Sequence, residues 1–269
     1  MKIVIFRGGI GNQLFLYEYY MHLKSTSDNG VYAVYLGKEH NGFELCKYFD
    51  AQVVFFPLLH DCVKILHILN KKYNSKLVSS FFIEEEKTKK RWWWSFIHLG
   101  VWQDKKYMGN VNIHFKDLPL SDKNNSIKQE MLKSNSVTIH IRRGDYLSPA
   151  FCTWYWHLDE TDYYQKAIEY VKRRFHTCSF FIFSDDIEWC KVNLPIENAY
   201  YIDWNKGKDS IYDMYLMSFA KVNTIANSTF SFWGAYLNKR SELTIYPLRW
   251  YKRTSFKNPD IFPVEWIGL

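Results

Sequence analysis

Two adjacent arginines follow an apolar run in the segment SVTIHIRRGDYL, residues 136–147. Side chains of a strand alternate between two faces, so His140 and Arg142 are predicted to share one face. The other face is predicted to hold the apolar side chains of Val137, Ile139 and Ile141. Ligands of open α/β sheets bind beyond the carboxyl ends of the strands, where Arg142 would lie. A guanidinium can donate two parallel hydrogen bonds to a diphosphate, and Arg142 is predicted to do so.

The loop after this strand carries Arg143 and Asp145, for which two interpretations stay open. They contact the same ligand as Arg142, or they form an ion pair with each other that braces the loop. In the second interpretation His140 is a core histidine whose polar atoms are satisfied.

Two aspartates in the second half are candidates for binding a nucleoside. Asp185 follows the predicted strand of FIFSDD, where a carboxylate can accept hydrogen bonds from ribose hydroxyls or from a base. The alternative is that it caps the helix that follows. Asp213, in SIYDMYLMS, could accept from the N1–H and N2–H₂ donors of guanine. Its alternative is a capping box with Ser210.

A third candidate group, Asn227, Ser228 and Thr229, lies between a predicted strand and a predicted helix. Backbone N–H groups and hydroxyls at the start of a helix can bind an anion, and simple helix capping is the alternative. The sequence contains no Asp-x-Asp motif, so a metal-bridged diphosphate is not favoured. Arginine would then carry the charge of a diphosphate leaving group.

The predicted elements around these residues alternate between strand and helix. KIVIF at residues 2–6 is predicted as a strand, and a glycine turn and a helix follow it. The second half repeats the alternation, which is typical of parallel βαβ units. A polar seam near residues 120–136 separates the halves. We therefore predict an α/β protein with two Rossmann-like domains facing across a cleft, residues 1–130 and 131–269.

The glycine turn RGGIGNQLF differs from a dinucleotide-binding fingerprint, because Leu14 stands where the third glycine should be. Glu39 follows the second predicted strand, so this loop alone does not exclude a nicotinamide-dependent oxidoreductase. The candidate phosphate-binding residues lie in the second half of the chain, however, and their position argues against that class.

The net charge of +7 favours an anionic partner but does not identify it. The five cysteines are dispersed, without a Cys-x-x-Cys pair, which indicates a reducing compartment. No apolar run approaches the ~18 residues of a membrane span, and KIVIF is too short for a signal peptide. We expect a protein of the cytoplasm, either free or at the inner face of the membrane. The basic and aromatic segment at residues 87–94 is either a membrane contact or a solvated surface.

Four blocks occur in the order GGIGNQLFLY, HIRRGDY, FSDDIEWC and DMYLMSFAKVNTIANSTFSFWGAYLN, ending near residue 238. With these blocks the sequence resembles the α-1,2-fucosyltransferases of glycosyltransferase family 11, particularly the bacterial ones that decorate O-antigen. Residues 40–130 match only loosely. One departure is Val222, where the family usually has a histidine.

The resemblance implies the GT-B fold, GDP-fucose as the donor, inversion at the anomeric carbon, and no metal or other cofactor. It implies that Arg142 contacts the β-phosphate, and that His140 and Asp213 lie near the guanine. It also places Ser228 and Thr229 near the diphosphate. The residues that it places near fucose or the acceptor are Gly11, Asn12 and Gln13. The implied acceptor is a β-galactoside glycan, either free or lipid-linked, and nucleic acid is not an expected partner.

In the chemistry that follows from this resemblance, Arg142 stabilises the departing phosphate while a galactose 2-hydroxyl attacks from the opposite face. Asp145 is the candidate general base, because it lies close to the arginine motif. Two alternatives stay open. One is a fucosyltransferase that forms an α-1,6 or protein-O linkage, and the other is a non-catalytic glycan-binding protein.

Overall fold

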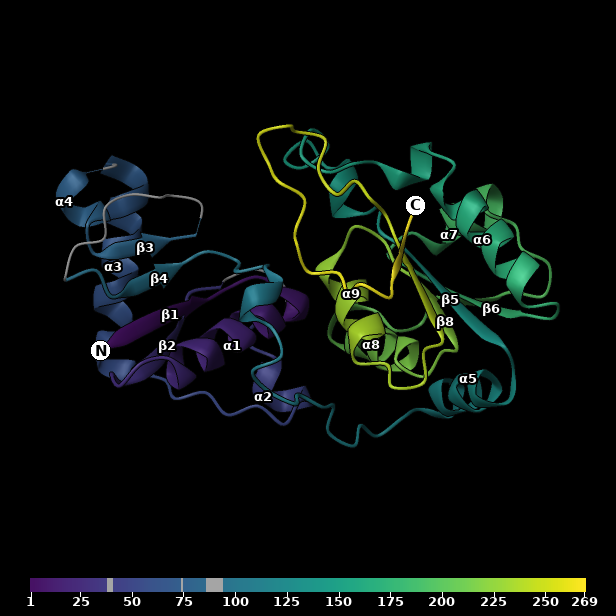
Figure 1. Ribbon diagram of the computed structural model, residues 1–269, viewed down its shortest axis with the longest axis horizontal. Coiled ribbons are helices and arrows are strands. Elements are labelled where there is room, and N and C mark those ends of the chain that lie inside the picture. Colours follow the sequence, from purple (N-terminus) through teal and green to yellow (C-terminus); the bar gives the residue numbers. More distant parts are fainter. Residues whose placement is uncertain (38–40, 74, 86–93) are drawn as a thin grey trace. The chain divides into compact units, whose positions relative to one another are not determined.

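The computed structural model describes residues 1–37, 41–73, 75–85 and 94–269 (Figure 1). The chain divides into two compact units, residues 1–116 and residues 117–269. Each unit contains a parallel sheet with helices packed against it. The predicted α/β class with two Rossmann-like domains is thereby confirmed. The cleft between the domains stays a prediction.

The sheet of the first unit has the strand order β2-β1-β4-β3, and its strands run parallel. The strands are β1 (Lys2–Phe6), β2 (Val31–Tyr35), β3 (Phe82–Glu84) and β4 (Ile97–Leu99). The helices are α1 (Ile10–Ser25), α2 (Leu45–Tyr48), α3 (Pro57–Tyr73) and α4 (Lys76–Ser79), with the 3-10 turn η1 (Lys105–Tyr107). The turn between β1 and α1 needs glycine at Gly8, whose φ is +76°.

The sheet of the second unit has the strand order β10-β9-β8-β5-β6-β7. Its strands are β5 (Ser136–Ile141), β6 (Ser179–Ser184), β7 (Tyr200–Ile202), β8 (Val222–Thr224), β9 (Leu243–Tyr246) and β10 (Ile267–Gly268), all parallel. From β5 the chain adds β6 and β7 on one side and then returns to add β8 on the other. The order therefore reverses between β5 and β8, which is where open α/β sheets bind ligands.

Helices cover this sheet (Figure 1). They are α5 (Asp122–Lys133), α6 (Tyr163–Arg174), α7 (Ile187–Asn193), α8 (Ile211–Met217) and α9 (Thr229–Tyr236), with 3-10 turns η2 (Asp145–Leu147), η3 (Leu158–Glu160) and η4 (Gly207–Ser210). The predicted apolar face of β5 is confirmed, because its three side chains are buried in one core with Tyr164 and Val171 of α6. Val222, at the position of the family's histidine, is buried in β8 beside Val137.

The boundary between the units lies at residues 116 and 117, not at residues 130 and 131 as predicted. The reason is α5, which packs against β5 and α8 and so belongs to the second unit. The polar composition of its exposed side made this segment resemble a linker. The helix begins at a capping serine, since the Ser121 hydroxyl accepts a hydrogen bond from the Asn124 backbone N–H.

Two sequence predictions lie outside the described residues. One is Glu39, and the other is the segment at residues 87–94 apart from Trp94. The Trp94 indole donates to the Ser80 hydroxyl at 2.9 Å. Among the described helices, none is both long enough and apolar enough to cross a bilayer.

Candidate active site

Arg142 is the first residue after β5, at the edge where the strand order reverses. Its guanidinium forms two ion pairs, from Nη2 to Asp145 Oδ1 at 2.9 Å and from Nη1 to Asp185 Oδ2 at 3.1 Å. Burial lowers the pKa of Arg142, but Asp185 and Asp145 outweigh this effect and hold the pKa above its usual value. The side chain keeps 27% of its surface exposed. Arg142 is therefore a fixed positive charge that a ligand can reach.

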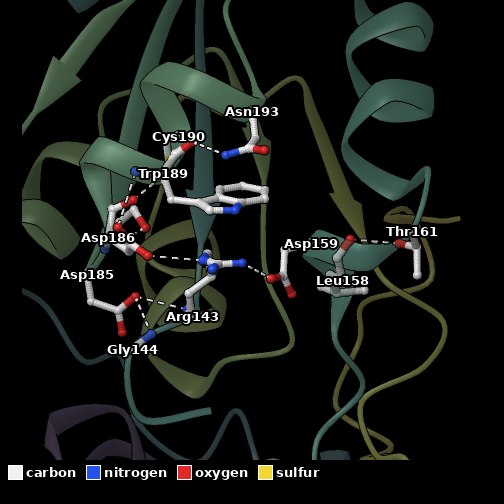
Figure 2. A network of polar contacts seen from close by, with 11 residues as sticks. Arg143, Gly144, Leu158, Asp159, Thr161, Asp185, Asp186, Trp189, Cys190 and Asn193 are labelled. Carbon is white, nitrogen blue, oxygen red and sulfur yellow. Dashed lines mark hydrogen bonds and ion pairs between the residues drawn. The ribbon is translucent and has the colours of Figure 1, made fainter. Parts of the chain in front are cut away.

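Asp185 fixes the backbone of the loop that carries both arginines (Figure 2). Its Oδ1 accepts hydrogen bonds from the backbone N–H groups of Arg143 and Gly144, at 2.9 and 3.0 Å. A Cβ at position 144 would lie 2.7 Å from Asp185 Oδ2, so the approach requires glycine there. Both oxygens of Asp185 thus have protein partners. The geometry assigns this residue a bracing role, and a carboxylate with these partners keeps further acceptor sites, so its predicted ribose contact stays a prediction.

Helix capping, the alternative for Asp185, is performed by its neighbour. Asp186 Oδ1 accepts from the Trp189 backbone N–H at 3.2 Å and caps α7. The two adjacent carboxylates therefore have separate roles, one toward the arginine loop and the other toward the helix. Periodicity in the sequence does not distinguish them.

Arg143 lies between two other carboxylates, those of Asp186 and Asp159 (Figure 2). Its Nε is 3.1 Å from Asp186 Oδ2, and its Nη1 pairs with Asp159 of η3. The Trp189 ring covers the guanidinium, with 4.2 Å between Arg143 Cζ and the ring centroid. The predicted ion pair of Arg143 with Asp145 is wrong, because Asp145 turns back onto Arg142 through η2.

His140 lies beside Arg142 on the predicted face of β5 and is buried. Burial and the charge of Arg142 lower the pKa of His140 to about 3, and Asp185 opposes this shift only in part. The ring is therefore neutral at ordinary pH. Within the described part of the chain Nδ1 has no hydrogen-bond partner. The alternative of a fully satisfied core histidine is thus wrong for this nitrogen.

The loop between β8 and α9 holds Asn227, Ser228 and Thr229 at the neighbouring strand end. The Asn227 amide donates to the carbonyls of Trp156 and Trp250, each at 2.9 Å, so its side-chain donors are used within the protein. These two hydrogen bonds give the Asn227 amide a structural role, and a ligand contact of this residue stays a prediction. The Ser228 hydroxyl accepts from the Phe230 backbone N–H at 3.3 Å, which is the capping alternative. Anion binding by Ser228 and Thr229 stays a prediction.

Tyr146 joins this loop to the arginine loop and was not singled out in the sequence. Its hydroxyl donates to the Asn227 carbonyl at 2.8 Å, and its ring stacks on Tyr155 with centroids 3.9 Å apart. Arg142 lies 5.8 Å from the Tyr146 ring centroid. Tyr146 follows Asp145 in the chain, so its place in the arginine motif was the available signal.

Asp213 is a partly buried carboxyl group in the first turn of α8. Its Oδ1 accepts from the Asn205 amide at 2.8 Å. Burial raises the pKa of Asp213 to about 8, against the smaller opposing effect of this hydrogen bond. The Ser210 side chain makes no capping hydrogen bond, so the capping-box alternative is not formed.

We expect Asp213→Asn to change how stability depends on pH. The folded-state pKa of about 8 lies above the ordinary value of 3.8, so the folded protein binds this proton more tightly than the unfolded chain does. The free energy of unfolding should then fall as the pH rises from about 4 through 8, and the asparagine variant should lose this component. Urea unfolding of both proteins across this range measures the difference. A difference that is independent of pH would contradict the expectation.

The predicted substrate-binding residues of the first unit, Gly11, Asn12 and Gln13, lie in the first turn of α1, and the Gln13 side chain has its hydrogen-bond partners within this unit. Its Nε2 donates to the carbonyls of Gly8 and Gly42 at 2.9 Å each, and its Oε1 accepts from the backbone N–H groups of Glu44 and Leu45. This fully buried amide ties the glycine turn to the following loop, so its side chain is structural.

Asn12 and Gly11, the other two predicted residues, differ in exposure. Asn12 is partly exposed, and its Oδ1 accepts from the Gln103 amide at 3.2 Å. Gly11 is buried. Substrate binding by these two residues stays a prediction. Among the described residues, no cluster of three or more His, Cys, Asp or Glu side chains has an arrangement that could hold a metal ion.

A parallel sheet whose strand order reverses beside a partly exposed arginine places that arginine where open α/β proteins bind their ligands. The sequence model of glycosyl transferase family 11 matches residues 87–269. The chain is 33% identical to an alpha-1,2-colitosyltransferase of Escherichia coli over 309 aligned positions, covering 100% of this chain and 99% of that protein. The chain belongs to glycosyltransferase family 11, and it is therefore a glycosyltransferase.

Two further relatives match over parts of their length. The O-antigen biosynthesis glycosyltransferase WbnK of Escherichia coli is 37% identical over 120 residues, 44% of this chain and 40% of that protein. The galactoside 2-alpha-L-fucosyltransferase SEC1 of Bos taurus is 30% identical over 143 residues, 51% of this chain and 38% of that protein.

Proposed function

We propose that this glycosyltransferase moves fucose from GDP-fucose to the 2-hydroxyl of a β-galactoside, with inversion, in O-antigen biosynthesis. The names of the three relatives support the α-1,2 linkage, the galactoside acceptor and the O-antigen pathway. The observation that carries the proposal is Arg142, a partly exposed guanidinium at the ends of β5 and β8 in a family 11 chain. This position suits the diphosphate of a nucleotide sugar.

The proposed role of Arg142 follows from the charge that develops in the reaction. Cleavage of the bond between C1 of the sugar and the phosphate oxygen leaves a cation-like sugar and adds negative charge to GDP. A preorganised guanidinium stabilises that charge where it appears. The galactose hydroxyl attacks the face opposite the leaving group, so a β-linked donor gives an α-linked product. No step of this scheme requires a metal ion, and we propose a metal-independent reaction.

Asp145 is the proposed general base, and its contact with Arg142 suggests how it becomes available. Asp145 Oδ1 lies 2.9 Å from Nη2 of the Arg142 guanidinium and occupies this edge. A β-phosphate that binds this edge competes with the carboxylate for the same N–H groups. Release of Asp145 would leave a carboxylate beside the reacting centre, able to take the proton of the attacking hydroxyl.

The second candidate donor is GDP-colitose, which the similarity to a colitosyltransferase along the whole chain favours. Colitose is the 3-deoxy counterpart of fucose, so the two donors differ by one hydroxyl group. A site that hydrogen-bonds this hydroxyl would discriminate strongly against colitose, because its polar groups would otherwise stay unpaired. A site that packs apolar groups there would accept both.

The test is a transfer assay with both donors on acceptors that end in Galβ1,3 or Galβ1,4, in the presence of EDTA, with the product linkage determined by NMR. We expect an α-1,2-linked product with at least one donor and no loss of rate in EDTA. An α-1,6 product, transfer to protein, or glycan binding without turnover would contradict the proposal. Strong inhibition by EDTA would contradict its metal-free chemistry.

A further inference from the structure

Helix α3 of the first unit has apolar side chains on two sides, but only one of these sides packs against the core of the unit. Leu59, Val63 and Leu66 pack against the core of the sheet. On the other side Leu58 is 84% exposed, Ile65 56% and Ile68 52%. A helix on the surface of a sheet ordinarily carries polar side chains on its outer side. The apolar surface of α3 is thus wider than the packing of this unit needs.

The exposed apolar residues lie together along the helix. We define the outer face of α3 as Leu58, Cys62, Ile65, Ile68 and Tyr73, all of which are exposed. The first four are separated by three or four residues and so share one side of the helix, and Tyr73 follows Cys62 by about three turns on the same side. Leu77 of the adjoining α4 is 71% exposed and extends the apolar surface. A row of this length differs from the single exposed apolar residues found on most protein surfaces.

The charges beside the outer face are almost all positive. α3 and α4 contain four lysines, Lys64, Lys71, Lys72 and Lys76, and one acidic residue, Asp61. Within the described part of the chain none of these lysines forms an ion pair, and Lys72 lies over the Tyr73 ring at 5.1 Å from its centroid. Lysines of this kind can keep their ammonium groups in water while their stems lie along apolar surface.

We propose that the outer face of α3, with its lysines, docks the enzyme on an anionic lipid surface. An amphipathic helix lying in the plane of a membrane inserts apolar side chains below the headgroups and places lysines against anionic lipids. Nucleic acid would use the lysines but leave the leucine and isoleucine side chains in water. A symmetric contact with a second copy would bring two rows of lysines together. Only the lipid surface satisfies both features, whichever sugar is transferred.

The experiment is flotation of the full-length protein with vesicles of phosphatidylcholine and phosphatidylglycerol, and with vesicles of phosphatidylcholine alone. We expect the protein to bind the vesicles that contain phosphatidylglycerol. Binding to vesicles of phosphatidylcholine alone, or binding at high salt, should be weaker by at least about tenfold. Leu58→Gln/Ile65→Gln and Lys64→Gln/Lys71→Gln/Lys72→Gln should each weaken binding about tenfold or more. The matched control Lys166→Gln/Lys172→Gln/Arg173→Gln removes the same charge from exposed positions of α6 and should bind as the wild type does.

Several outcomes would overturn the proposal. Undiminished vesicle binding by both α3 variants would assign any membrane contact to another segment. Preferential binding to duplex DNA, or a dimer that the leucine and isoleucine substitutions dissociate, would assign the face to a different partner. A lowered melting temperature in the Leu58→Gln/Ile65→Gln variant would mean that the face packs within the chain. Transfer to a soluble acceptor should be unchanged in all variants, which separates this test from that of the proposed function.

Discussion

Arg142→Ala should lower kcat/KM for sugar transfer by at least about 100- to 1,000-fold, as expected for removing a preorganised charge from a developing anion. The fold should persist, because the Arg142 side chain is partly exposed and Asp185 still holds the loop through two backbone N–H groups. Initial rates over a range of donor concentrations, together with circular dichroism and thermal unfolding, measure both expectations. A rate near that of the wild type would refute the diphosphate role.

Arg142→Lys separates charge from geometry. Lysine keeps the positive charge but cannot donate the paired hydrogen bonds of a guanidinium. We expect an activity between those of the wild type and the alanine variant. Equal loss in both variants would assign the whole effect to the paired hydrogen bonds.

Arg143→Ala should act on stability, with an expected loss of about 3–5 kcal/mol in the free energy of unfolding of the second unit. The substitution leaves Asp159, whose side chain is only 5% exposed, without its cation, and it removes the group that Trp189 covers. Urea unfolding monitored by tryptophan fluorescence measures the change. Arg173→Ala is the matched control, because its 81% exposed side chain forms only a surface pair with Glu169. That variant should differ from the wild type by less than about 1 kcal/mol.

A second substitution makes the Arg143 prediction specific. If the loss comes from an unpaired buried carboxylate, Arg143→Ala/Asp159→Asn should be more stable than Arg143→Ala alone. The comparison remains informative if the single variant is recovered only in part as soluble protein. Equal stability of the single and double variants, or of Arg143→Ala and Arg173→Ala, would contradict the bracing role.

Local patterns in the sequence were sufficient to predict the strand β5 and the position of Arg142 at its end. Alternation of apolar and polar side chains gave the buried face of the strand, and the end of the run gave the place of the arginine. The partners of the neighbouring Arg143 were not predictable in this way. Asp159 and Asp186 come from separate turns, and only tertiary packing brings them to one guanidinium.

The structural contacts of polar motif residues were also not predictable from the sequence. Gln13 and Asn227 belong to motifs of the family, and their amides looked suited to a ligand. Each is buried, and its side-chain N–H groups donate to backbone carbonyls of loops, most of them distant in the sequence. A sequence gives the hydrogen-bonding capacity of an amide but not the partners that the fold supplies. The domain boundary failed for a related reason, since the packing of α5 is not visible in its polar composition.

Calorimetric titration of GDP and of GMP shows whether Arg142 binds the β-phosphate of the donor. The two ligands differ only in that phosphate group. The wild-type protein should bind GDP at least about tenfold more tightly than GMP, as expected for hydrogen bonds between charged groups. Arg142→Ala should lose this preference while binding GMP with unchanged affinity. An Arg142→Ala variant that still prefers GDP to the same degree would contradict the account.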